Sequence, residues 1–103
     1  MKNVFIHHVF FWLKNPDSTA DKQQLVAGLQ KLSVATSIQT FHIGTAAATN
    51  REVIDSSYSL SWMLIFATKE AQDIYQTDPV HLQFIKDCAH LWQKVLVYDA
   101  VDV

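Results

Sequence analysis

The sequence of 103 residues predicts an α+β fold in which helices cover one face of a four-stranded antiparallel sheet. Four segments are rich in β-branched and aromatic residues, and the clearest of them alternates regularly between its two faces. Between these segments, apolar residues recur at helical spacing. The order is therefore strand, helix, strand, strand, helix, helix, strand, which is the split βαβ or ferredoxin-like arrangement in one domain over residues 1–103.

The first strand is predicted over residues 4–13, which are apolar on both faces. Because side chains alternate along a strand, His8 lies on one face and His7 on the other. A strand of this kind is buried on both sides. We expect His7 to face the interior or the rim of a barrel and to have a structural role.

The next elements follow the same rules. Ser18 or Asp17 can cap the first helix, and Thr68 can cap the second. Gly44 marks a bulge or a close approach at the end of the second strand. In chain order we expect a turn at 14–18, a helix to about Leu32, a strand over 38–45, a loop over 46–57, a strand over 58–67 and a helix over 69–77.

A helix boundary is predicted at Asp78 and Pro79. The residue before proline avoids the α region, and Asp followed by Pro suits the N-cap and first position of a new helix. His81 then lies in the first turn, where the helix dipole favours a neutral imidazole, although Asp78 opposes this. Tyr75 precedes the break. A buried stripe is expected at His81, Phe84, Ile85, Cys88, Leu91, Trp92 and Val95, before a final strand over 95–101.

Composition narrows the classes of partner. The net charge is −2 and lysine and arginine do not cluster, which argues against binding to nucleic acid or an anionic membrane. No run approaches the roughly 18 apolar residues of a membrane span. Cys88 is the single cysteine, which excludes an intrachain disulfide and fits a reducing, cytoplasmic compartment. A small, largely apolar ligand is the expected partner.

The sheet predicts a second partner, which is another copy of the chain. Helices on one side cover only one face, whereas the first strand is apolar on both faces and the third keeps Met63 and Ile65 on its outer side. With no other domain to cover this face, we expect a homodimer whose sheets pack face to face.

Two segments carry a family pattern, namely Ile-His-His-Val-Phe-Phe at 6–11 and Tyr-Gln-Thr-Asp-Pro-Val-His at 75–81. Together with the order of the elements, they resemble the Dabb family of stress-responsive dimeric α/β-barrel proteins. Gly44 and the closing Val-Tyr-Asp at 97–99 also match the family pattern. The resemblance covers nearly the whole chain. It implies a ferredoxin-like fold and a dimer whose two sheets form a barrel.

The resemblance also implies a site. In the plant relative olivetolic acid cyclase, a strand histidine, a tyrosine and a helix histidine promote an intramolecular aldol closure without a cofactor, and the matching positions here are His8, Tyr75 and His81. Such a reaction needs a base beside a carbonyl and a donor for the developing oxyanion. His81 is the candidate base, Tyr75 positions it or donates, and His8 shares the pocket.

Several functions remain open at this point. The first is a non-catalytic dimer that binds a small apolar ligand, the second is the cyclase or lyase, and the third is a barrel-type monooxygenase. His8 and His81 could instead form a hydrogen-bonded pair in the core, or bind a metal with one carboxylate. Cys88 is expected to be an inert core residue. A cavity of a few hundred Å³ beside the three site residues favours ligand binding, and tight packing favours the core pair.

Overall fold

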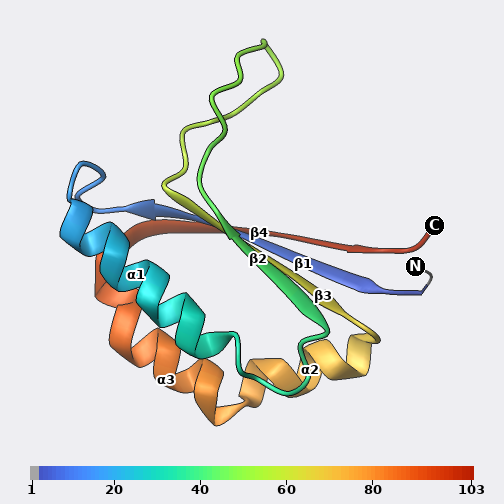
Figure 1. Cartoon of the computed structure of the whole chain (residues 1–103). Coiled ribbons are helices and arrows are strands. Elements are labelled where there is room, and N and C mark those ends of the chain that lie inside the picture. Colours follow the sequence, from blue (N-terminus) through green and yellow to red (C-terminus); the bar gives the residue numbers. More distant parts are fainter. Residues whose placement is uncertain (1–2) are drawn as a thin grey trace.

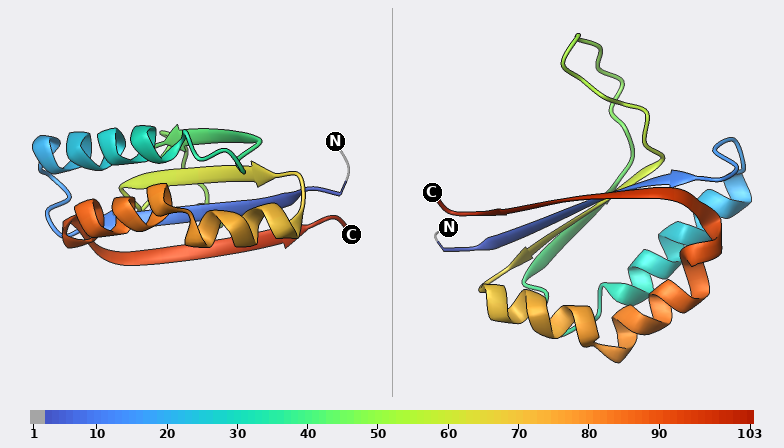
Figure 2. Two further views of the ribbon diagram at one scale, coloured as in Figure 1. Left: turned by 90° about the horizontal axis from the view of Figure 1, so that it is seen from below. Right: turned by 180° about the vertical axis from the view of Figure 1, so that it is seen from behind.

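The sheet has the predicted architecture. A computed structural model describes residues 3–103, in which four antiparallel strands form one sheet in the order β2-β3-β1-β4. The helices cover one face of this sheet and leave the other without a helix (Figures 1 and 2). The strands are β1 (Phe5–Leu13), β2 (Thr40–Gly44), β3 (Leu60–Phe66) and β4 (Trp92–Val101), and the helices are α1 (Thr19–Leu32), α2 (Lys69–Thr77) and α3 (Pro79–Cys88).

The predicted helix starts are confirmed, each with its capping hydrogen bond. The Ser18 hydroxyl accepts from the amide of Asp21 at 3.1 Å at the start of α1. Thr68 caps α2 in the same way. Asp78 accepts from the amide of Val80 at 2.8 Å, and its extended backbone separates α2 from α3. This break lets α3 turn while it stays on the same face of the sheet as α2 (Figure 2).

The end of α3 differs from the prediction. The helical stripe was expected to continue through Trp92 and Val95, but α3 ends at Cys88, a 3₁₀ turn follows, and β4 starts at Trp92. Sheet pairing overrides the helical spacing here, because β4 pairs with β1 from Leu13 onward. Of the stripe, Phe84, Cys88 and Leu91 are buried, whereas Ile85 and Val95 remain partly exposed.

The core lies between the sheet and the helices. Alternate residues of β1 and β3 point into it, as the regular alternation of the third strand predicted. On the helix side, the core is closed by Leu25, Leu29 and Leu32 of α1 and by Phe84 of α3. The buried strand residues are Phe5, Val9, Phe11, Leu13, Leu60, Trp62, Leu64 and Phe66.

Gly28 sets the distance between α1 and α3. A Cβ at this position would lie 2.5 Å from the Cys88 Sγ and 3.4 Å from the Phe84 ring. Overpacking of this kind costs about 1–3 kcal/mol, which exceeds the gain of about 1 kcal/mol from the better helix former. Gly28→Ala should therefore lower the free energy of unfolding in a urea titration. The added Cys88→Ala change should recover part of that loss, and an unchanged Gly28→Ala midpoint would contradict the packing argument.

Candidate functional site

A cavity of about 230 Å³ lies between the helix-facing side of the sheet and the α2–α3 junction. β1 and β4, with Trp62 of β3, form its floor, and α2 and α3 form its wall. Its surface is mostly hydrocarbon, with a phenol and two imidazoles among the exceptions. The lining residues are His7, Val9, Phe11, Trp62, Tyr75, Gln76, His81, Phe84, Ile85, Trp92, Val95 and Val97.

Tyr75 supplies a proton donor to the cavity. Its side chain is buried, and its hydroxyl oxygen accepts a hydrogen bond from the indole N–H of Trp62 at 3.2 Å. Burial raises the pKa of Tyr75 to about 12, so the phenol stays protonated at physiological pH. Because the Trp62 bond uses only a lone pair, the O–H proton remains available for donation.

His81 supplies a proton acceptor next to that phenol. The two ring centroids are 4.6 Å apart, and the His81 Nδ1 lies 3.2 Å from the carbonyl oxygen of Gln76. A carbonyl can only accept, so Nδ1 carries the hydrogen and Nε2 keeps its lone pair. Burial lowers the pKa of His81, while the Gln76 hydrogen bond and Asp78 act in the opposite direction. The ring is therefore neutral at pH 7 and can act as a base.

The strand histidine of this cavity is His7. This residue is 7% exposed, and its ring centroid lies 6.1 Å from that of Tyr75. The ring bonds through Nδ1 to the Asp99 carboxylate at 2.6 Å. The prediction that His8 shares the pocket is wrong. His8 lies on the opposite face of the sheet, where its ring packs on Phe10 at 4.2 Å.

The pattern of β1 contained a signal for this assignment. On the side of His7 the strand is apolar through Leu13, whereas the side of His8 continues to Lys14, the exposed residue after the strand. The side that stays apolar is the one that enters the core. Asp99 was noted only as part of the closing Val-Tyr-Asp and not as a site residue, because its pairing with His7 depends on the register between β1 and β4.

Family comparison decides the classification. The model of the stress-responsive A/B barrel domain, Dabb, matches residues 5–102. The chain belongs to the Dabb family. Comparison of the sequence with curated proteins found no match.

Solved structures have the same fold as this Dabb chain at low sequence identity. A Dabb protein with a ferredoxin-like fold from Mesorhizobium loti is 23% identical with a TM-score of 0.81, and the match covers 99% of each chain. Hydroxynitrile lyase from Passiflora edulis is 19% identical with a TM-score of 0.79, over 100% of this chain and 96% of that one. A dimeric ferredoxin-like protein of unknown function from Thermobifida fusca is 14% identical with a TM-score of 0.78, over 99% and 93%.

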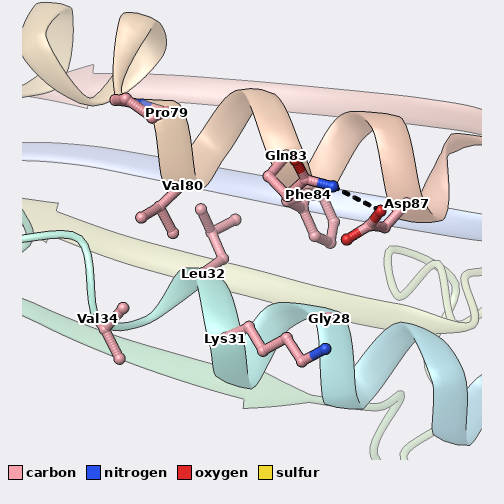
Figure 3. Close-up of a pocket in the computed structure, with 9 residues that line it drawn as sticks. All are labelled: Gly28, Lys31, Leu32, Val34, Pro79, Val80, Gln83, Phe84 and Asp87. Carbon is pink, nitrogen blue, oxygen red and sulfur yellow. Dashed lines mark hydrogen bonds between the residues drawn. The ribbon is translucent and has the colours of Figure 1, made fainter.

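A larger hollow of about 340 Å³ lies between α1 and α3 of the Dabb domain (Figure 3). Leu32, Val80 and Phe84 form its apolar base, and Asp87 at the rim accepts a hydrogen bond from the Gln83 amide at 2.8 Å. Its walls carry no imidazole, phenol or thiol. It therefore lacks a group that exchanges protons near neutral pH, and the smaller cavity is the better candidate for chemistry.

Two sequence hypotheses about His8 and His81 fail on this geometry. The rings lie on opposite faces of the sheet, so they form neither a core pair nor two ligands of one metal. Within residues 3–103, no group of three or more His, Cys, Asp or Glu side chains could hold a metal ion. In the same part of the chain, no helix is long and apolar enough to span a membrane.

The lowered pKa of His81 predicts a pH dependence of stability. The unfolded ring titrates near its ordinary value of 6.5 and the folded ring below it. The unfolded state therefore binds more protons in this window, and stability falls as the pH drops from 6.5 through the lowered folded value. His8, whose pKa burial also lowers, contributes in the same direction.

Urea titrations between pH 7.5 and 5 measure this slope. His81→Gln should make the free energy of unfolding depend less steeply on pH, and the dependence that remains should be the contribution of His8. Equal slopes in both proteins would show that the pKa of His81 is the same in the folded and unfolded states.

Proposed function

We propose that this Dabb protein binds a small, largely apolar carbonyl compound in the His7–Tyr75–His81 cavity and forms or cleaves a carbon–carbon bond beside the carbonyl without a cofactor. One observation carries the proposal. The space beside the Tyr75 hydroxyl and the His81 ring is a cavity of about 230 Å³ and not packed core. Pockets that bind drug-sized ligands have volumes of about 300–1,000 Å³, so a smaller molecule is expected here.

The arrangement suits an aldol reaction. The His81 Nε2 removes the proton from a carbon next to one carbonyl, and that carbon attacks a second carbonyl of the same molecule. The Tyr75 O–H donates to the oxygen on which charge develops. The proton held on His81 then returns to that oxygen, directly or through a second proton carrier in the cavity, so atoms and charge balance. The reverse sequence cleaves the bond.

The apolar lining supports both binding and catalysis. Val9, Phe11 and Val97 contribute hydrocarbon surface, which favours an apolar substrate and keeps water away from the reacting groups. In a site with little water, a hydrogen bond to a developing oxyanion is stronger than in bulk solvent. The phenol and the imidazole are positioned before substrate binds, because Trp62 and Gln76 each hold one of them.

The proposal includes a homodimer. The face of the sheet without helices carries half-buried apolar residues from three strands, including Ile6, Phe10, Met63 and Leu96. The loop between β2 and β3 projects from this side (Figure 1). Similar structures from Thermobifida fusca, Bacteroides fragilis and Jannaschia are described as dimeric. A second copy packed on this face would produce a barrel from two sheets, which agrees with the A/B barrel in the family description.

Two probe reactions test the catalytic proposal. The first is cleavage of mandelonitrile into benzaldehyde and cyanide, chosen because the Passiflora neighbour is a hydroxynitrile lyase. The second is aldol closure of a linear triketone, which is monitored by the absorbance of the cyclic product. Turnover of either probe that is lost in His81→Gln supports the proposal.

Binding experiments separate the remaining functions. Chemical-shift changes at Tyr75 and His81 on addition of benzaldehyde, with no turnover of either probe, would indicate a non-catalytic ligand carrier. Oxygen uptake with a quinol substrate would indicate a monooxygenase. A protein that does not bind benzaldehyde and does not turn over either probe would contradict the proposal.

A further inference from the structure

We propose that Asp99 is a positioning residue that holds His7 as a second proton carrier of the same cavity, so that His7 and His81 act on two different atoms of one substrate. This inference rests on the proposed function. It identifies which substrates suit the site, namely compounds in which one atom loses a proton while another gains one, such as a hydroxynitrile or a β-hydroxy ketone.

The contact is built into the sheet. His7 of β1 and Asp99 of β4 are direct partners in the antiparallel register, and the two strands run side by side (Figure 1). The Nδ1–Oδ1 distance of 2.6 Å is at the short end for a hydrogen bond to a charged group. Since both residues lie within strands, rigid backbone fixes the geometry on both sides of the bond.

The bond determines which nitrogen serves the cavity. A carboxylate accepts and does not donate, so Nδ1 carries a hydrogen and the remaining nitrogen, Nε2, is free for a ligand. His7 lines the cavity with Tyr75 and His81. A carboxylate at this distance also stabilises the imidazolium that forms when His7 takes up a proton.

The two imidazoles differ in their partners. Asp99 offers His7 a full negative charge, whereas Gln76 offers His81 only a carbonyl oxygen. The positive charge of a protonated His7 also disfavours protonation of His81, which is one cause of the lowered pKa of His81. The two rings are therefore held by different partners and line the same cavity, so they can contact different atoms of one substrate.

Asp99 is suited to positioning more than to stabilising the fold. Its side chain is 45% exposed, so solvent screens its charge and weakens its effect on stability. The same exposure makes it reachable by small solutes. An Asp99→Ala protein should therefore keep its fold and accept formate in place of the missing carboxylate.

The test is the tautomer of His7, which nitrogen-15 NMR reads directly and which does not depend on any enzymatic assay. In the unmodified protein Nδ1 should be protonated. In Asp99→Ala the ring should shift to a mixture of both tautomers, and formate should restore the original signal. Asp73→Ala, which removes an exposed carboxylate paired with Lys69 on α2, is the matched control and should leave the His7 signal unchanged.

Kinetics give a second, separate readout. With mandelonitrile, Asp99→Ala and His7→Gln should each lower kcat by about 10²–10⁴-fold, and the double variant should lose no more than His7→Gln alone. A His7 tautomer that is unchanged in Asp99→Ala overturns the inference, as do losses that multiply in the double variant. If no probe is turned over, the proposed function fails, whereas the tautomer result still decides the role of Asp99.

Discussion

His81→Gln should reduce turnover of the probe substrates by about 10²–10⁴-fold and leave a folded protein. The glutamine amide can still donate to the Gln76 carbonyl, as the His81 Nδ1 does, and its size is close to that of the imidazole. It cannot take up a proton, so the base is lost while the contact is kept. Steady-state kinetics measure the effect, with circular dichroism and thermal unfolding as checks on the fold.

His90→Gln is the matched control for this experiment. His90 is exposed in the 3₁₀ turn after α3 and does not line the cavity. Its replacement should change neither turnover nor melting temperature. If His81→Gln instead unfolds the chain while His90→Gln does not, His81 is needed for packing, and its assignment as a catalytic base loses its support.

Met63→Glu should convert the proposed dimer into monomers. Met63 lies opposite His8 on one side and His42 on the other, near the middle of the sheet face without helices. Burying a carboxylate costs several kcal/mol, and a two-fold interface places two of them together. The dissociation constant should rise by at least about 10³-fold, since each 1.4 kcal/mol is tenfold.

Sedimentation equilibrium at micromolar concentration measures this change. Gln30→Glu adds the same charge on the exposed side of α1 and should leave the association unchanged. Because Met63 points away from the helix-covered core, Met63→Glu should keep its circular dichroism spectrum. A Met63→Glu protein that remains dimeric would place the interface on another surface.

Most of the fold could be predicted because local signals and global packing agree. Alternation identified β3, and Ser18, Thr68 and Asp78 marked three helix starts that the structure confirms. The end of α3 was wrong because helical spacing continues past Cys88 in the sequence, while pairing with β1 requires a strand there. The spacing of apolar residues does not show whether a segment will form a helix locally or pair as a strand with a distant part of the chain.

The site was harder to predict than the fold. Tyr75 and His81 lie together across the break at Asp78 and Pro79, as the family resemblance implied. The choice between His7 and His8 depended on which side of β1 faces the helices, and adjacent residues of a strand always point in opposite directions. The contact between Asp99 and His7 could not be predicted, because it depends on the register between two strands and its residues lie 92 positions apart in the sequence.

The two ends of the described chain lie beside each other, and this has a practical consequence for engineering. The Asp102 carboxylate accepts hydrogen bonds from the backbone amides of Asn3 and Val4 at 2.8 and 2.9 Å. A short linker could therefore join these ends, and the exposed loop at residues 46–57 offers a place to open the chain instead. Such a circular permutant would keep the pairings β2–β3, β3–β1 and β1–β4, and it would give fused reporter domains attachment points on the opposite side of the sheet from the helices.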